Sequence, residues 1–351
     1  MLILSIETSC DETSAAVVKD GQEVLSNLIS SQIDFHRKYG GIVPELAARK
    51  HIEVISPIIK EALELAGVGF KDINAVAVTY GPGLIGSLLV GLSAAKAIAF
   101  AKNIPLIGIN HLEGHIYANF LNSPPLSPSL NKRGGRGVSF PFINLLVSGG
   151  HTMIVLVEDH GKYRTLGRTR DDAAGEAYDK IARFLNIGYP GGPIIDKMAK
   201  DGDPAAIEFK RPMIEKEFGY DFSFSGLKTA VVNFVNRESS RVPRVTNHEQ
   251  RITDIVASFQ AALVDVLVEK TIRAAREFNC QTITIAGGVS ANSSLRQKMQ
   301  EKAAEKGLTL ILPPLAYCTD NAAMIGCAAF YKLAAGQSSG LELSPVASLR
   351  L

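Results

Sequence analysis

A pattern that occurs twice along the chain limits the folds open to it: a short apolar strand, a small polar turn and a second apolar strand. In the first copy we expect strands at 2–6 and 15–18, on either side of the polar turn 7–14. The second copy places strands at 142–147 and 153–157 around the turn 148–151 (SGGH). We infer an internal duplication in which each half begins with a hairpin.

Each half continues with further strands and helices. After the first hairpin, apolar spacing predicts helices at 52–66 and 84–101, strands at 75–79 and 104–109, and a helix from near Glu113. After the second, it predicts a mainly helical region at 172–275, a strand at 282–286, and helices at 293–306 and 321–335. Apolar strands separated by helices are typical of an α/β domain with a largely covered sheet.

A break in composition separates the halves. Residues 122–141 are rich in proline and carry basic residues with little apolar content, which indicates an exposed loop or linker. We therefore expect an N-terminal lobe at 1–121 and a C-terminal lobe at 142–335, with the helical region of about 172–275 inserted in it. Residues 336–351 are expected to form a C-terminal tail without a motif.

The length and composition support two ordered domains. A chain of 351 residues that is 46% hydrophobic has enough apolar material for a sizeable core, which excludes disorder. The formal net charge of +2 lacks the strong basic excess of a protein that coats nucleic acid by itself. Charge alone neither assigns nor excludes a nucleic-acid partner.

We expect a cytoplasmic chain that does not cross a membrane. Residues 73–95 are uncharged and long enough to span a bilayer, but 81–83 (GPG) interrupt them, which favours a strand, a turn and a buried helix. The N-terminal residues predict no export signal. Four cysteines without a CxxC pair point to a reducing compartment and not to a disulfide framework.

Two histidines and one aspartate form a candidate metal site. His111 and His115 are four residues apart, so on a helix both imidazoles lie on one face. Asp320 offers a carboxylate as third ligand, although it is equally suited to be the N-cap of the following helix. A zincin would need a glutamate directly after the first histidine. Glu113 is one residue too late and faces away, which disfavours a metallopeptidase. His51 is expected to be a solvated surface group.

Small-residue turns form a candidate nucleotide site. The turn 148–150 has bare backbone N–H groups that can approach a phosphate, but an ordinary hairpin turn explains the same residues. Gly287 and Gly288 follow a third strand, where they permit close approach by an adenine ring. Asn292 can hydrogen-bond that ring or cap the next helix.

Nine segments together carry a resemblance to a known family. The chain resembles the bacterial TsaD family of tRNA adenosine threonylcarbamoyltransferases, once described as glycoproteases, from residue 1 to about 335. The segments are 5–12 (SIETSCDE), 81–84 (GPGL), 110–115 (NHLEGH), 146–151 (LVSGGH), 171–177 (DDAAGEA), 189–193 (YPGGP), 222–228 (FSFSGLK), 286–292 (AGGVSAN) and 318–321 (CTDN).

The resemblance implies a fold and a set of site residues. The fold would be two duplicated actin-like α/β lobes around a central nucleotide and metal cleft. His111, His115 and Asp320 would bind one divalent ion, iron or zinc, with Asp320 coming from the opposite half. The matching nucleotide contacts are Asp179, Gly192, Asp196 and Asn292, and the segment along the phosphate and acyl group is Leu146, Val147, Ser148, Gly149 and Gly150.

The resemblance also implies a reaction. The family transfers threonylcarbamoyl from threonylcarbamoyl-AMP to the exocyclic amine of the adenosine 3′ of the anticodon, in tRNAs reading codons that begin with A. Asp11 and Glu12, at the tip of the first hairpin, are our candidates for taking the amine's proton or orienting the amine. A turn held by polar side chains explains both residues equally well.

Partners and alternatives follow from the same resemblance. Bacterial members work with a paralogous partner, TsaB, and a small ATPase, TsaE, and a homo-oligomer stays open. ATP or ADP is a second candidate occupant of the cleft. A small-molecule kinase of the same architecture and a non-catalytic ATP-binding scaffold remain alternatives. The hypothesised tRNA phosphate contacts are basic clusters at 132–136, 210–211 and 237–251.

Overall fold

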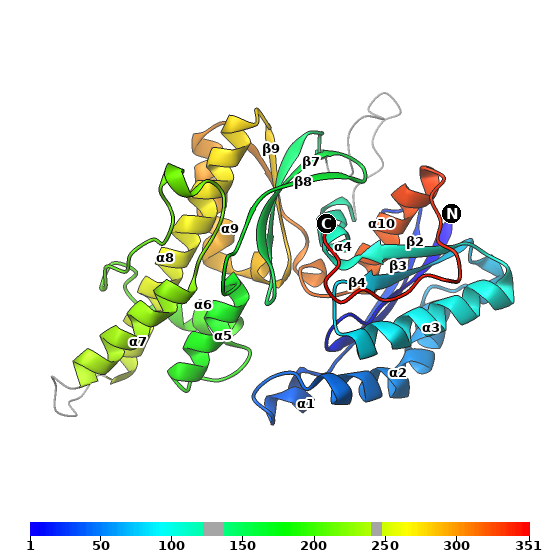
Figure 1. Cartoon of the computed structure of the whole chain (residues 1–351), viewed down its shortest axis with the longest axis horizontal. Coiled ribbons are helices and arrows are strands. Elements are labelled where there is room, and N and C mark those ends of the chain that lie inside the picture. Colours follow the sequence, from blue (N-terminus) through cyan, green and yellow to red (C-terminus); the bar gives the residue numbers. More distant parts are fainter. Residues whose placement is uncertain (122–136, 240–247) are drawn as a thin grey trace. The chain divides into compact units, whose positions relative to one another are not determined.

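The computed structural model describes residues 1–121, 137–239 and 248–351, which form two compact units. Unit 1 comprises Met1–Ser139 together with Pro313–Leu351, and unit 2 comprises Phe140–Leu312. Each unit contains one five-stranded sheet with helices packed against it (Figure 1).

The sheet of unit 1 has the strand order β3-β2-β1-β4-β5. The first hairpin is antiparallel, with β1 paired to β2 and β2 to β3, whereas β1, β4 and β5 run parallel. The parallel strands therefore share one carboxyl-terminal edge. The bounds are β1 Leu2–Glu7, β2 Glu12–Lys19, β3 Glu23–Ser31, β4 Ala75–Gly81 and β5 Leu106–Asn110.

Side chains alternate between the two faces of this sheet, and each face is covered by helices. Leu4 and Ile6 belong to a core that they share with α2 (Pro44–Leu65) and α3 (Ile85–Lys102). On the alternate positions of β1, Ser5 Oγ donates a hydrogen bond to the carbonyl of Ala322, at the start of α10 (Ala322–Ala334). The remaining helices of this unit are α1 (Ile33–Arg37) and α4 (His111–Tyr117).

The sheet of unit 2 repeats that of unit 1. Its order is β10-β9-β6-β7-β8, with an antiparallel β6–β7–β8 meander and parallel β6, β9 and β10. Each hairpin therefore occupies the equivalent place in its own sheet, which confirms the predicted duplication and the α/β fold class. The bounds are β6 Phe142–Val147, β7 Thr152–Asp159, β8 Lys162–Arg168, β9 Thr282–Ala286 and β10 Thr309–Ile311.

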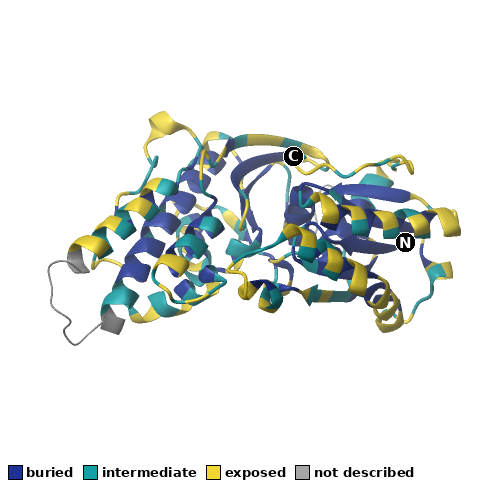
Figure 2. Cartoon of the chain, turned by 60° about the horizontal axis from the view of Figure 1, so that its bottom comes forward, coloured by how far each residue is buried: buried dark blue, intermediate teal, exposed yellow. Residues whose placement is uncertain are grey.

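Helices supply most of the core of unit 2. The buried side chains of β6 and β7 pack with apolar residues of the long helix α8, and Figure 2 shows this buried interior in both sheets. The region expected to be mainly helical is helical over most of its described length. The helices are α5 Ala174–Phe184, α6 Gly191–Met198, α7 Ser225–Ser239, α8 His248–Glu277 and α9 Ser293–Glu305.

The C-terminal part of the chain differs from the expectation. We expected 142–335 to form one lobe, but Pro313–Leu351 belongs to unit 1. The reason is close packing of α10 on β1 and β2: a Cβ added at Gly326 would lie 2.7 Å from Val18 Cγ2. The chain thus returns to its first sheet after completing the second.

The tail after α10 extends this return along unit 1. Ser339 N donates to Leu106 O and Val346 N donates to Tyr80 O, both at 2.8 Å. Near its end, the carbonyl of Arg350 accepts a hydrogen bond from Asn110 Nδ2 at 2.9 Å. The tail therefore contacts both β4 and β5, and it reaches the residue that begins α4.

Residues 73–95 form a strand, a turn and the start of a helix, as predicted. Among the helices of the described residues, α3 alone has the length and apolar composition to cross a membrane. It packs against α2, and Leu92 and Ala95 lie in the core of unit 1. One face of α3 is therefore buried in unit 1, whereas Ile85, Leu89 and Phe100 are exposed.

Candidate functional site

The first part of the site is the histidine pair of α4. This helix begins directly after β5, and its N-cap is Asn110, whose Oδ1 accepts a hydrogen bond from Leu112 N at 2.9 Å. The helix starts at His111, two residues before the expected position. One helical turn brings the rings of His111 and His115 together, with centroids 4.6 Å apart.

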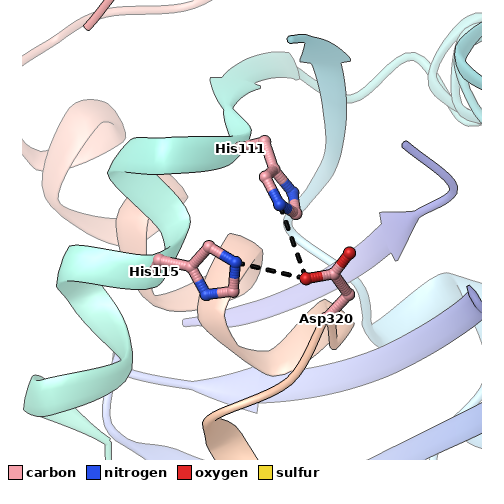
Figure 3. Close-up of side chains that lie close together, drawn as sticks. All are labelled: His111, His115 and Asp320. Carbon is pink, nitrogen blue, oxygen red and sulfur yellow. Dashed lines mark ion pairs between the residues drawn. The ribbon is translucent and has the colours of Figure 1, made fainter. Parts of the chain in front are cut away.

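Asp320 lies beside both histidines (Figure 3). Its Oδ1 is 3.1 Å from His115 Nε2 and 3.5 Å from His111 Nε2. The N-cap of α10 is Asn321, whose Oδ1 accepts from Met324 N, so the capping role proposed for Asp320 falls to its neighbour. Asp320 was expected to come from the opposite half, but it belongs to unit 1 with the histidines.

The donor set fits a divalent metal ion. His115 is fully buried, yet neither of its ring nitrogens makes a hydrogen bond with any of the described residues. Buried polar atoms without partners are rare and call for an explanation such as an ion. One ligand atom from each of His111, His115 and Asp320 lies within 4.8 Å of the others. Two imidazole nitrogens and one carboxylate oxygen suit iron or zinc.

A buried carboxylate supports the first histidine from behind. Glu7, at the end of β1, has its Oε2 3.1 Å from His111 Nδ1, and Ser9 Oγ is equally close to that nitrogen. Burial alone lowers the pKa of His111, but the charges of Asp320 and Glu7 outweigh it and raise the pKa to about 9. Burial raises the pKa of Glu7, but His111 more than compensates and holds it below its ordinary value.

Glu113 takes no part in this group. Its carboxylate makes an ion pair of 2.7 Å with Lys332 of α10, which also donates to the carbonyl of Gly108. The glutamate therefore ties α4 to α10 on the side away from the histidines. This geometry matches the argument against a zincin-type peptidase.

The tip of the first hairpin is more buried than its polar sequence suggests. Asp11 is a buried residue, and burial raises the pKa of Glu12 to about 10, with further increases from the charges of Asp320 and Asp11. The expectation for His51 was wrong, because its side chain is fully buried. Its Nδ1 lies 2.7 Å from Thr13 Oγ1 and its Nε2 lies 3.0 Å from the carbonyl oxygen of Cys10, so it supports the tip from α2.

A separate candidate region is the glycine turn of unit 2. A Cβ added at Gly149 or Gly150 would meet no atom within 4 Å, and both residues are exposed. The N-terminus of α5 lies against this turn, because Gly175 N donates to Ser148 O at 3.2 Å. Leu146 and Val147 are fully buried strand residues and Ser148 is half-buried, so of this segment only Gly149 and Gly150 are exposed.

The other predicted nucleotide residues gather where α5, α6 and α9 meet. Asp179 Oδ1 accepts from Gly191 N at 2.7 Å, next to Gly192, and burial raises the pKa of Asp179. Asp196 of α6 accepts from both the amide and the hydroxyl of Ser293 at the start of α9. The structure thus brings these segments of unit 2 together.

Asn292 has the capping role that the sequence left open. Its Oδ1 accepts from Leu295 N at 2.9 Å, and its Nδ2 donates to Gln260 Oε1 at 2.7 Å. Gln260 also accepts from the hydroxyl of Tyr178. Sequence reasoning missed Gln260 and Tyr178, because a polar residue on a helix and a buried tyrosine carry no signal of a site.

The basic clusters are only partly within the described residues. Cluster 132–136 and the middle of 237–251 lie outside them. Arg211 makes an ion pair of 2.9 Å with Asp265 and also donates to the carbonyl of Phe209, which commits its guanidinium to unit 2 itself. This leaves Lys210 as the exposed cation of its cluster.

Comparison with solved structures defines the class of protein. HypF from T. kodakarensis aligns over 95% of this chain and 48% of its own, with a TM-score of 0.61 at 15% identity. Component A of the (R)-2-hydroxyglutaryl-CoA dehydratase of Acidaminococcus fermentans aligns over 95% and 99%, with a TM-score of 0.51 at 17% identity. At these identities the likeness concerns the fold, which is that of actin-like ATPases.

Comparison of sequences identifies the family. The family model of TsaD, tRNA N6-adenosine threonylcarbamoyltransferase, matches residues 23–327, and the chain belongs to this family. Proteins with that name from Clostridioides difficile (strain 630) and Caldicellulosiruptor saccharolyticus are each 52% identical over 351 residues. Those alignments cover 100% of this chain and 98% of each relative. The chain is therefore a transferase that places threonylcarbamoyl on tRNA adenosine, and not a small-molecule kinase or a scaffold.

Proposed function

We propose that the donor is threonylcarbamoyl-AMP and that the acceptor is the adenosine 3′ of the anticodon in tRNAs that read codons beginning with A. His111, His115 and Asp320 hold one divalent ion, iron or zinc. The observation that carries this assignment is the buried His115, whose ring nitrogens lack hydrogen-bond partners among the described residues. When bound, such an ion supplies Lewis-acid stabilisation of negative charge on a carbonyl or phosphate oxygen.

The residues of unit 2 bind the adenylate in this proposal. Ser148 N donates to His151 O within the turn, so the exposed glycines Gly149 and Gly150 offer their backbone N–H groups to the phosphate. The eleven-residue helix α5 adds the positive end of its dipole. Asp179 and Asp196 accept hydrogen bonds from the ribose hydroxyls. Carboxylates suit this role because they accept hydroxyl donors, whereas they would repel a phosphate. Gly192 and Asn292 lie beside them and line the adenine side.

The two acidic residues at the hairpin tip take different roles. Burial and the charges of Asp320 and Asp11 raise the pKa of Glu12 to about 10 in the chain without a cation, and we assign Glu12 to orienting the substrate amine. Asp11 is then the candidate that accepts the proton of the amine. Loss of that proton is required because an aromatic exocyclic amine is a weak nucleophile.

We propose further that the chain works in the cytoplasm with TsaB and TsaE. The support is the family resemblance and the modest net charge of +2, which predicts weak tRNA binding by this chain alone. Partners would complete the tRNA-binding surface. ATP or ADP remains the second candidate occupant of the nucleotide residues, and the oligomeric state is left to measurement.

The test combines a transfer assay with metal analysis. The protein is incubated with threonylcarbamoyl-AMP, unmodified tRNA, TsaB and TsaE, and the modified nucleoside is measured by mass spectrometry. We expect product above a control with the partners alone. His115→Ala should lose both the metal and the product, whereas the matched control His160→Gln, a histidine of unit 2 outside these groups, should keep both. A metal-replete His115→Ala protein would refute the ligand set.

A further inference from the structure

The residue from which the inference starts is Glu7, which none of the roles above uses. It ends β1 and is fully buried, with its carboxylate facing the ring of His111. Burial of a carboxylate is unfavourable unless its oxygens are fully hydrogen-bonded. Among the described residues, His111 is the only ion-pair partner of Glu7. Position 7 therefore requires a side chain that accepts hydrogen bonds.

The hydrogen bonds around Glu7 fix the direction of the contact with His111. Its Oε1 accepts from Ser9 N at 2.5 Å, and its Oε2 accepts from Thr79 Oγ1 at 2.5 Å. These two donors come from the hairpin turn and from β4, so the carboxylate is held from two sides. An ionised carboxylate can only accept. The proton in the contact with His111 must therefore lie on the imidazole Nδ1, 3.1 Å away.

A proton on Nδ1 leaves the lone pair of the neutral ring on Nε2. That nitrogen is the one that faces Asp320 Oδ1 at 3.5 Å, on the side of the ring away from Glu7. His115 lacks such support, since its Nδ1 has no hydrogen-bond partner in the described residues. The two histidines therefore differ: the Nδ1 of His111 faces a buried carboxylate, whereas His115 faces a carboxylate only at Nε2, where Asp320 Oδ1 lies 3.1 Å away.

We propose that Glu7 is a positioning residue that fixes the tautomer and ring orientation of His111, so that Nε2 is presented to the metal. The proposal rests on the metal site put forward under the proposed function. Such carboxylate–histidine pairs around metal ions also raise the basicity of the ligand, and losing one typically weakens metal binding by about tenfold to a hundredfold. Thr79 and the backbone amide of Ser9 hold the carboxylate of Glu7 in place, and Ser9 Oγ also lies 3.1 Å from His111 Nδ1.

The first experiment measures zinc affinity by competition with a chelator. Glu7→Gln keeps the shape of the side chain but replaces one acceptor oxygen with an NH₂ group. At one of the three contacts, with Ser9 N, Thr79 Oγ1 or His111 Nδ1, two hydrogen-bond donors then face each other. We expect zinc affinity to fall by about tenfold to a hundredfold. The matched control is Glu113→Gln, which removes another buried carboxylate of α4, one that is paired with Lys332. Its zinc affinity should equal that of the parent.

The remaining arms separate the two hypotheses. If His115→Ala still binds zinc as the parent does, the metal site itself is wrong. If His115→Ala loses zinc but Glu7→Gln binds as tightly as the parent, only the role of Glu7 is wrong. Should Glu7→Gln fail to fold, ¹⁵N-histidine NMR of the zinc-loaded parent decides: we expect His111 with a hydrogen-bonded proton on Nδ1 and metal on Nε2. The opposite tautomer would overturn the proposal.

Discussion

The candidate metal ligand and the N-cap of α10 are different residues, Asp320 and Asn321. From the sequence, Asp320 was a candidate for both roles. Because Asn321 caps α10, the carboxylate of Asp320 remains available to the two histidines. The spacing of the two histidines made them candidate ligands, and the family resemblance implied the full set with Asp320. It missed Glu7, because a glutamate at the start of a polar turn looks like an ordinary turn residue until the fold places β4 and α4 beside it.

His160 provides a residue-scale test that is independent of the site. Burial lowers its pKa to about 4, against an ordinary value of 6.5. As the pH falls from about 6.5 to about 4, the unfolded chain takes up a proton that the folded chain does not, so folding stability is lost over this range. His160→Gln removes this term and should lose less stability on acidification. The check is the urea midpoint of parent and variant at pH 7 and pH 4.5, where equal losses would contradict the assignment.

At the scale of elements, prediction succeeded where a strand is buried on both faces and failed where it is exposed. The strands β1, β6 and β9 are nearly continuous apolar runs and were found, whereas β2 was found only over its apolar part, 15–18. By contrast, β8 has four exposed positions of seven and β3 mixes polar and apolar residues. Neither segment therefore shows the regular apolar pattern by which a strand is predicted. The beginning of α2 at Pro44 was also missed, because Arg49, Lys50 and His51 interrupt the apolar spacing before Ile52.

The contact between α5 and the turn 148–150 depends on a glycine. A Cβ at Gly175 would lie 2.7 Å from Ser148 O and 2.8 Å from Gly149 Cα, both backbone atoms that cannot turn aside. Gly175→Ala should therefore push α5 from the turn, lower the stability by about 1–3 kcal/mol and weaken adenylate binding. The measurements are chemical unfolding and calorimetry with a non-reactive adenylate analogue.

The matched control is Gly226→Ala in α7. A Cβ there would meet nothing within 4 Å, and alanine favours a helix, so the stability should stay the same or rise. If both variants bind the analogue as the parent does, the turn is not the phosphate site. A loss confined to Gly175→Ala supports it.

At the scale of the whole molecule, the chain consists of one continuous unit and one discontinuous unit. Unit 2 has its own sheet and core within Phe140–Leu312. We expect this fragment, expressed alone, to unfold cooperatively in a circular-dichroism melt, since compact units with a separate core fold independently. An unfolded or aggregated fragment would show that unit 2 depends on unit 1.

We expect the metal to bind to unit 1 and not to unit 2. His111, His115 and Asp320 all belong to unit 1, so the fragment of unit 2 should take up no zinc at this site. A chain in which a short glycine–serine linker joins Ser139 to Pro313 is the matched counterpart and should bind zinc. Zinc analysis of both purified proteins, by mass spectrometry, distinguishes the outcomes.

The duplication was predictable at this scale but the return of the chain was not. Two similar hairpins are visible in the sequence, whereas the sheet to which a late apolar helix returns is decided by tertiary packing. Gly326 and Ser5 permit α10 to lie closely on β1, and neither residue carries that information by itself. The expected boundary at 335 was wrong for this reason.

The return of Pro313–Leu351 to unit 1 has a consequence for biosynthesis. The histidines leave the ribosome early, but Asp320, α10 and the tail that hydrogen-bonds to Asn110 are translated after the whole of unit 2. Unit 2 can therefore fold before the sheet of unit 1 is covered by α10. A nascent chain that ends before Asp320 has no complete ligand set, so acquisition of the metal at this site requires that unit 2 has already been translated.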